Sequence, residues 1–142
     1  MNLIKVFEKI FERQKNGEYE NIYIMIDIHN TILEPSFDKN KEEFIYLPYA
    51  ETVLRKLTKL PYVKLIMWTS SHDERTEMYL NHFRKNEICF NYINTNPEIK
   101  DEAYACFKTK FYYDIGIDDK FGFEADKDWY EILQFLNNFE KK

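Results

Sequence analysis

Cysteine is scarce in this chain, and the two cysteines, Cys89 and Cys106, lack the spacing of a metal site. We expect both to be reduced thiols, with a disulfide as the minor alternative. No apolar run approaches the length that a membrane span needs. Charges from Lys5 onward interrupt the apolar residues of the N-terminus, which is not the pattern of a signal peptide. A cytoplasmic location with no membrane partner is the expectation.

An excess of basic residues is also lacking, because the formal net charge is -5. This disfavours a general nucleic-acid binder, which needs a basic face, although a local basic pocket stays open. Disorder is excluded by a hydrophobic fraction of 44% and an aromatic fraction of 18%. The 142 residues show no internal repeat or linker, so we expect one domain over residues 1–142.

Apolar periodicity predicts an alternation of helices and strands. The expected elements are a helix over 2–15, a strand over 22–27, a helix over 48–60, a strand over 63–68, a helix over 72–86, strands over 88–93 and 111–117, and a helix over 127–139. Ser71 is the expected cap of the helix over 72–86. Alternation of this kind predicts a three-layer, Rossmann-like α/β fold with a parallel sheet and helices on both faces.

One stretch organises the rest of the chain. Five apolar residues, from Ile22 to Ile26, run without a break and stop at Asp27. A continuous apolar run of this length indicates a strand buried on both faces, as in a parallel sheet. Asp27 would then lie at the carboxyl end of the strand, where open α/β sheets bind their ligands.

Two other strands also end in polar residues, Thr69-Ser70 and Asp118-Asp119, and Lys110 precedes the last of them. If the strands are parallel neighbours, these residues share one edge of the sheet. Clustered carboxylates repel one another unless a cation lies among them, and Mg²⁺ accepts one or two carboxylates together with substrate phosphate. A carboxylate can act as a nucleophile toward phosphorus. The pattern therefore predicts Mg²⁺-dependent phosphoryl transfer to an aspartate.

The motifs resemble those of the haloacid dehalogenase superfamily of phosphohydrolases. The first motif of that family, Asp-x-Asp-x-Thr after a strand, is here Asp27-Ile28-His29-Asn30-Thr31. The second, a Thr or Ser that ends a strand, is Met67-Trp68-Thr69. The last two combine in a Lys-x-x-x-Asp-x-x-Ile-Asp-Asp-Lys pattern from Lys110 to Lys120. The resemblance extends over about residues 22–130, and the order of the motifs makes the set fairly specific.

The resemblance implies a role for each matched residue. Asp27 would be the nucleophile and a metal ligand. Asp119, with Asp118, would complete the metal site, and the backbone carbonyl of His29 would be a further ligand. The phosphate would be bound by Thr69, Ser70, Asn30 and Lys110, with Lys110 preferred over Lys108 on spacing. Thr31 would steady the loop after Asp27.

His29 departs from the family pattern, which places a second Asp at this position as general acid and base. A histidine side chain can still move protons near neutral pH, and a nearby cation would make it a better base than acid. The alternative is that His29 only packs, and that the chain is a binding or regulatory protein without turnover. A third alternative is another enzyme of the same fold that attacks a carbon–halogen or carbon–phosphorus bond. The metal-type carboxylates Asp118 and Asp119 disfavour the dehalogenase.

Neither interval between the motifs leaves room for a cap domain, so we expect an open site. Such a site admits large phosphorylated substrates, and an oligomer could cover it. The segment 34–49 is the expected local flap. Trp68 and Trp129 are expected in the core, and Asp126 and Asp128 at the start of the last helix.

Overall fold

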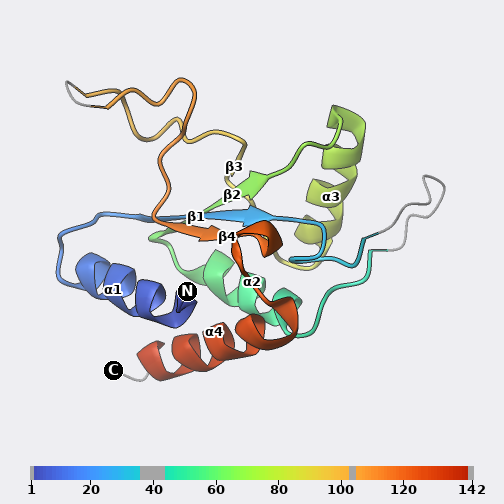
Figure 1. Ribbon diagram of the computed structural model, residues 1–142, viewed down its shortest axis with the longest axis horizontal. Helices are drawn as coiled ribbons and strands as arrows, with labels where there is room; N and C mark the ends of the chain where they lie inside the picture. The colour runs from blue at the N-terminus through green and yellow to red at the C-terminus, as the bar shows by residue number, and fades with distance from the viewer. Residues whose placement is uncertain (1, 36–43, 103–104, 141–142) are drawn as a thin grey trace.

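The centre of the protein is a four-stranded parallel sheet with the strand order β3-β2-β1-β4 (Figure 1). The computed structural model describes residues 2–35, 44–102 and 105–140. The strands are β1 (Ile22–Asp27), β2 (Val63–Trp68), β3 (Tyr92–Ile93) and β4 (Ile115–Ile117). β1 is central and fully in register with β2, from Ile22↔Val63 to Asp27↔Trp68. The predicted parallel α/β fold is confirmed.

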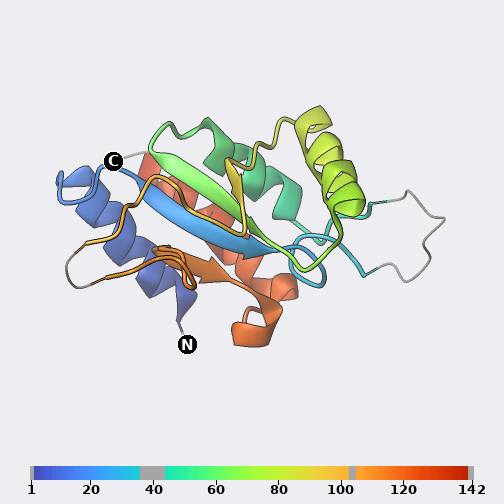
Figure 2. The same ribbon diagram turned by 90° about the horizontal axis from the view of Figure 1, so that it is seen from above.

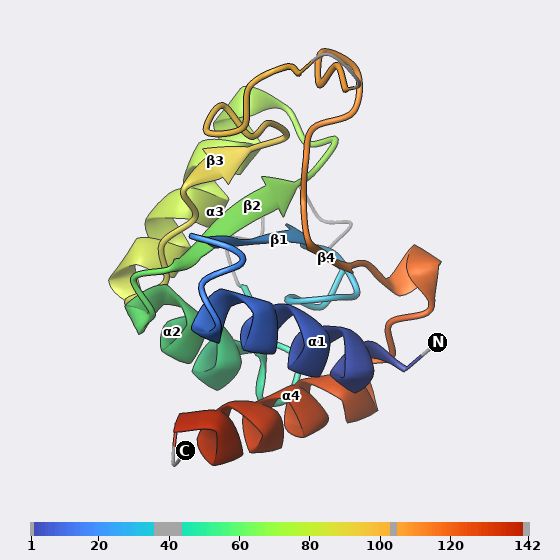
Figure 3. The same ribbon diagram turned by 90° about the vertical axis from the view of Figure 1, so that its left-hand side faces the viewer.

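Four helices flank this sheet: α1 (Leu3–Lys15), α2 (Ala50–Lys59), α3 (Asp73–Lys85) and α4 (Ala125–Glu140). Seen along the sheet, α1, α2 and α4 lie together on one face, and α3 lies beside α2 toward β3 (Figure 3). The apolar stripe of α1 packs on α4, where Phe11 meets Phe135 at a ring-centroid distance of 5.3 Å. No helix in the described ranges is long and apolar enough to cross a membrane.

The second face of the sheet is covered differently from our expectation of helices on both faces. The connection from β3 to β4 runs over it, opposite α1 and α4 (Figure 2), and its described residues contain no helix. Tyr112 packs edge-on against Tyr23 of β1, with ring centroids 6.0 Å apart. Tyr113 approaches Gly116 so closely that an added Cβ would lie 3.1 Å from its ring. Aromatic side chains of a connecting segment thus take the place of a helix layer.

β3 and β4 are shorter than the predicted strands over 88–93 and 111–117. Before β3, the side chain of Asn91 accepts the N–H of Leu65 at 2.8 Å. Before β4, the carboxylate of Asp114 accepts the N–H of Tyr23 at 2.9 Å. Side-chain acceptors of this kind compete with strand ladders for backbone donors. Both strands therefore pair for only a few residues near the carboxyl edge.

The starts of α2 and α3 differ from the prediction for identifiable reasons. The cap position of α3 is His72 rather than Ser71, and it makes no side-chain cap bond. Ser71 is held by Thr69, whose hydroxyl accepts the Ser71 N–H at 3.1 Å and donates to Ser71 Oγ at 3.0 Å. α2 begins at Ala50 because Tyr49 adopts a left-handed conformation with φ 68. The buried face of α2 consists of Ala50, Val53, Leu54 and Leu57.

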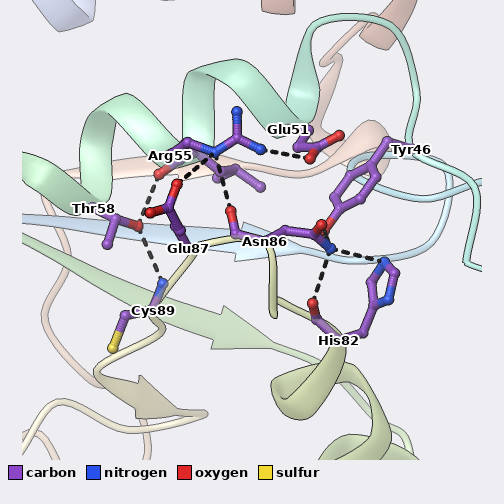
Figure 4. Close-up of polar contacts among 9 residues, drawn as sticks. Tyr46, Glu51, Arg55, Thr58, His82, Asn86, Glu87 and Cys89 are labelled. Atoms are coloured by element: carbon purple, nitrogen blue, oxygen red, sulfur yellow. Dashed lines mark hydrogen bonds and ion pairs between the residues drawn. The ribbon is translucent and has the colours of Figure 1, made fainter. Parts of the chain in front are cut away.

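A polar network fixes the end of α3 to α2 (Figure 4). Arg55 of α2 pairs with Glu51 and donates from Nε to the carbonyl oxygen of Asn86 at 3.1 Å. The Asn86 amide donates in turn to the Tyr46 hydroxyl at 3.0 Å and to the His82 carbonyl at 2.9 Å. These bonds satisfy polar groups at the end of the helix. They hold α3 in a fixed place beside the carboxyl edge of the sheet.

Candidate functional site

An open cleft of about 860 Å³ lies at the carboxyl edge of the sheet. The loops that follow β1, β2 and β4 form its floor and walls. Seven of the predicted site residues line it: Asp27, His29, Asn30, Thr69, Ser70, Asp118 and Asp119. Five further residues, which the sequence did not single out for the site, also line it: Pro35, Trp68, Asn94, Lys120 and Phe121. Half of the expected flap over 34–49, residues 36–43, lies outside the described ranges.

Three carboxylates converge on the floor of this cleft. Asp27 ends β1, Asp118 follows β4, and Asp119 begins the short 3-10 helix η1 (Asp119–Phe121). One oxygen from each lies within 4.8 Å of the other two. They meet because β1 and β4 are parallel neighbours, with Ile26 opposite Ile117. The convergence of these three aspartates agrees with the sequence-based expectation.

The electrostatics of the cluster favour an added positive charge. Burial, together with the charge of Asp118, raises the pKa of Asp27 to about 6. Burial also raises the pKa of Asp118. Both shifts mean that negative charge is costly here, and a cation among the carboxylates would relieve that cost.

This donor set suits Mg²⁺, which prefers oxygen ligands and binds through a few carboxylates. Asp27, Asp118 and Asp119 supply carboxylate oxygens on one wall of an open cleft. The cleft leaves room for the waters or phosphate oxygens that Mg²⁺ keeps as its other ligands. The residues present therefore fit the metal that the sequence predicts.

Thr31 connects two members of the cluster. Its hydroxyl donates to Asp27 Oδ2 at 3.2 Å and accepts the N–H of Asp119 at 3.2 Å. The side chain is fully buried, and its carbonyl oxygen accepts the indole N–H of Trp129 at 2.6 Å. Thr31 thus holds the loop after β1 against β4 and α4, in agreement with its expected positioning role.

A second wall of the cleft is built on the end of β2. The side-chain amide of Asn94 makes two hydrogen bonds with the backbone of Thr69. Its Oδ1 accepts the Thr69 N–H at 2.9 Å, and its Nδ2 donates to the Thr69 carbonyl at 2.7 Å. Asn94 itself adopts a positive φ of 53, which asparagine tolerates better than most residues. The clamp fixes where the hydroxyls of Thr69 and Ser70 enter the cleft.

His29 is engaged by residues of α3. Its Nε2 lies 2.6 Å from the hydroxyl of Tyr79, and that hydroxyl accepts a hydrogen bond from Arg75 Nε at 3.1 Å. Burial and the Arg75 guanidinium lower the pKa of His29. The imidazole is therefore neutral near pH 7, which makes it a proton acceptor rather than a donor. The sequence did not single out Tyr79, which is only 2% exposed.

The lysine of the cleft is not the expected one. Lys110 is exposed and does not line the cleft, whereas Lys120 does. Lys110 belongs to the connection that precedes β4, whereas the cleft is lined by residues that follow this strand. Lys120 lies in η1, immediately after Asp118 and Asp119, and so is brought to the cleft with them.

Two aromatic residues of the cleft, Trp68 and Phe121, were not predicted there. We expected Trp68 in the core, but it is 40% exposed on the cleft, whereas Trp129 is fully buried as predicted. Strand alternation could have indicated this, because Met67 joins the core and its neighbour must face the other way. Phe121 is 52% exposed at the opposite side. Asp126 is exposed and is not a member of the carboxylate cluster, while Asp128 accepts the Glu124 N–H at 2.8 Å as a cap.

Comparison with known proteins supports the fold. No family model matches the chain, and no curated protein matches it. A solved structure of a conserved protein from Bacteroides thetaiotaomicron is 26% identical, with a TM-score of 0.61 over 86% of this chain and 93% of that chain. The D,D-heptose 1.7-bisphosphate phosphatase from B. bronchiseptica, solved with magnesium and phosphate, is 17% identical, with a TM-score of 0.42 over 60% of this chain and 55% of that chain. The first similarity confirms the α/β fold, and the second is too low to carry an argument.

Proposed function

We propose that this chain is a Mg²⁺-dependent phosphohydrolase that acts on phosphomonoesters through an aspartyl-phosphate at Asp27. The observation that carries the proposal is the position of Asp27. Its carboxylate belongs to the three-aspartate cluster and also faces a cleft that contains hydroxyl and ammonium donors. A nucleophile needs both: a cation to keep it ionised, and donors that hold the phosphate in reach.

In this proposal each residue of the cleft has its own role in transfer of the phosphoryl group. Asp27 attacks phosphorus, and the bond from phosphorus to the leaving oxygen breaks. Thr69 and Ser70 hold the phosphate oxygens, helped by the backbone of Asn30. Lys120 supplies the positive charge that the family resemblance assigns to Lys110. The three aspartates and the His29 carbonyl would hold Mg²⁺, and the metal would supply positive charge for the phosphate.

The second half of the reaction is hydrolysis of the acyl-phosphate. A water molecule attacks phosphorus and must lose a proton. Neutral His29 lies in the cleft and is the residue that we assign as its acceptor. The leaving alcohol of the first half takes its proton from solvent, because the cleft is open and His29 is not protonated at neutral pH.

The experiment measures hydrolysis of p-nitrophenyl phosphate with Mg²⁺, with EDTA, and by the Asp27→Asn variant. We expect turnover by the wild type with Mg²⁺ and loss of it in the other two cases. Asp126→Asn is a matched control, because it removes an exposed carboxylate outside the cluster. Metal-independent turnover, or an active Asp27→Asn variant, would contradict the proposal.

A second candidate, a metal-binding protein without turnover, is favoured by one observation. The imidazole of His29 is engaged by Tyr79, so it could serve only to position the loop after β1. The same experiment separates the two candidates. Mg²⁺ binding in calorimetry, with no hydrolysis on a broad panel of phosphate esters, would select the second.

A further inference from the structure

Exposed aromatic side chains gather at the candidate cleft. The described residues include five exposed large hydrophobic side chains: Ile45, Tyr49, Trp68, Phe121 and Tyr130. Two of the five, Trp68 and Phe121, line the cleft. Large aromatics are normally buried, because each removes a large apolar area from water. Trp68 and Phe121 instead leave part of their apolar area in contact with water, and both do so on the same cleft.

Their placement brackets the nucleophile. Trp68 ends β2 opposite Asp27 in the sheet register, and Phe121 ends η1 beyond β4. Because β1 lies between β2 and β4, Asp27 lies between the two aromatics along the edge of the sheet. A phosphate held at Asp27 would carry the rest of its molecule out past one or both rings.

The indole of Trp68 also packs against a second aromatic side chain. The ring of Phe111 lies 5.6 Å from it, and Tyr113 supports Phe111 at 5.9 Å. Both supporting residues come from the connection that covers the second face of the sheet. An exposed tryptophan fixed on one side presents its other side as a stacking surface, and Lys120 adds a positive charge next to Phe121.

We propose that Trp68, with Phe121, binds a planar aromatic group of the substrate, so that the preferred substrates are phosphomonoesters that carry a base or an aryl ring. This rests on the proposed function. The cleft volume of about 860 Å³ accommodates a nucleoside monophosphate, since small-molecule sites run from about 300 to 1,000 Å³. The net charge of -5 favours a small ligand of this kind over a nucleic-acid strand.

The test compares adenosine 5′-monophosphate with ribose 5-phosphate, which lacks only the base. We expect the wild type to show a kcat/KM ratio of about tenfold or more in favour of the nucleotide, as base stacking on an aromatic ring allows. Trp68→Ala should reduce that ratio to near one, whatever loss the two substrates share. Tyr130→Ala removes an aromatic that is 45% exposed away from the cleft, and it should leave the ratio unchanged.

Further substrates test which kind of aromatic phosphomonoester the cleft prefers. Phenyl phosphate places the ring directly on the ester oxygen, whereas the nucleotide places it beyond a sugar. A 5′-phosphorylated oligonucleotide tests a strand end; preference for it over the mononucleotide would overturn the small-ligand part of the proposal. A wild-type ratio near one, or a Trp68→Ala ratio equal to that of the wild type, would overturn the proposal as a whole.

A binding measurement keeps this inference separate from the proposed function. Adenosine 5′-monophosphate should quench the fluorescence of Trp68 in the metal-loaded Asp27→Asn variant, and ribose 5-phosphate should not. Adding Trp68→Phe should abolish the quench, because the remaining Trp129 is fully buried. Quenching without turnover in the wild type would refute the phosphatase and retain the ring site. Turnover with no quench and no preference for the nucleotide would refute the ring site and retain the phosphatase.

Discussion

The indole N–H of Trp129 donates a hydrogen bond of 2.6 Å to the carbonyl oxygen of Thr31. The two residues are 98 positions apart, and the bond is buried. It joins α4 to the loop that follows Asp27, the predicted nucleophile. The hydroxyl of Thr31 then reaches Asp27 on one side and the N–H of Asp119 on the other. The carboxylate cluster is therefore anchored to the hydrophobic core through one threonine.

Replacing Thr31 with valine should weaken metal binding while leaving the shape of the core intact. The variant loses the bond to Asp27 and leaves the N–H of Asp119 without its acceptor. We expect about 1–3 kcal/mol less stability and roughly tenfold weaker Mg²⁺ binding. Calorimetric titration and urea denaturation measure both, and Thr31→Ser, which keeps the hydroxyl, should restore most of the affinity. Equal Mg²⁺ affinity in the valine variant would show that the cluster needs no such anchor.

Asp27→Asn should stabilise the metal-free protein above neutral pH. The folded-state pKa of Asp27 is raised from 3.8 to about 6, so the folded state holds more protons than the unfolded state between these values. Stability therefore falls as pH rises through this window, and the full cost of the buried charge is present above it. Removing the charge should add about 1–2 kcal/mol at pH 8, after allowance for solvent screening, and nothing near pH 3.

Urea denaturation in EDTA across this pH range measures that difference. With Mg²⁺ present, the wild type should be the more stable of the two proteins. The metal binds the wild type more tightly, because the variant has lost one carboxylate ligand. Asp126→Asn is the control and should shift stability by less than about 0.5 kcal/mol at every pH. A metal-free Asp27→Asn variant less stable than the wild type at pH 8 would refute the assigned sign.

Lys120→Ala should impair catalysis far more than Lys110→Ala. Lys120 lines the cleft and supplies charge next to the phosphate position, whereas Lys110 is exposed outside it. We expect kcat/KM to fall about 10²–10³-fold in the first variant. The second should change it by no more than about threefold, as is usual for an exposed charge. The opposite order would return the phosphate-binding role to Lys110, as the family resemblance implies.

His29→Ala should slow the second half of the reaction. Without a proton acceptor, hydrolysis of the aspartyl-phosphate becomes rate-limiting, and we expect kcat to fall about 10²-fold. Acid quenching with labelled substrate should trap phosphoryl-enzyme in this variant and less of it in the wild type. Tyr79→Phe keeps the imidazole and removes only its hydroxyl partner, so it serves as the control. If both variants lose activity equally without trapped intermediate, His29 acts only by positioning.

The central strand of the sheet could be predicted from the sequence, because the hydrophobic pattern of its own residues determines it. The apolar run from Ile22 to Ile26 must be buried on both faces, and Asp27 must then end it. The edge strands could not be predicted in the same way. Asn91 and Asp114 take backbone donors from neighbouring strands, and a side chain that competes with a ladder leaves no periodic signal in the sequence.

The same limit applies to the candidate site. Asp27, Asp118 and Asp119 were predicted together because parallel neighbours share an edge. Lys120 was passed over because the family pattern directed attention to Lys110, whereas the turn into η1 after Asp118 and Asp119 brings Lys120 to the cleft. The clamp of Asn94 on Thr69 depends on a left-handed backbone conformation that composition alone does not reveal.

The brevity of β3 and β4 has a consequence for how this protein meets other copies of itself. They are the two outer strands of the sheet, and they span two and three residues. A long outer strand offers a row of free amide and carbonyl groups on which another chain can add by main-chain pairing. These strands present too few such groups to serve as a template. Protection from edge-to-edge polymerisation thus follows from the brevity of these two strands.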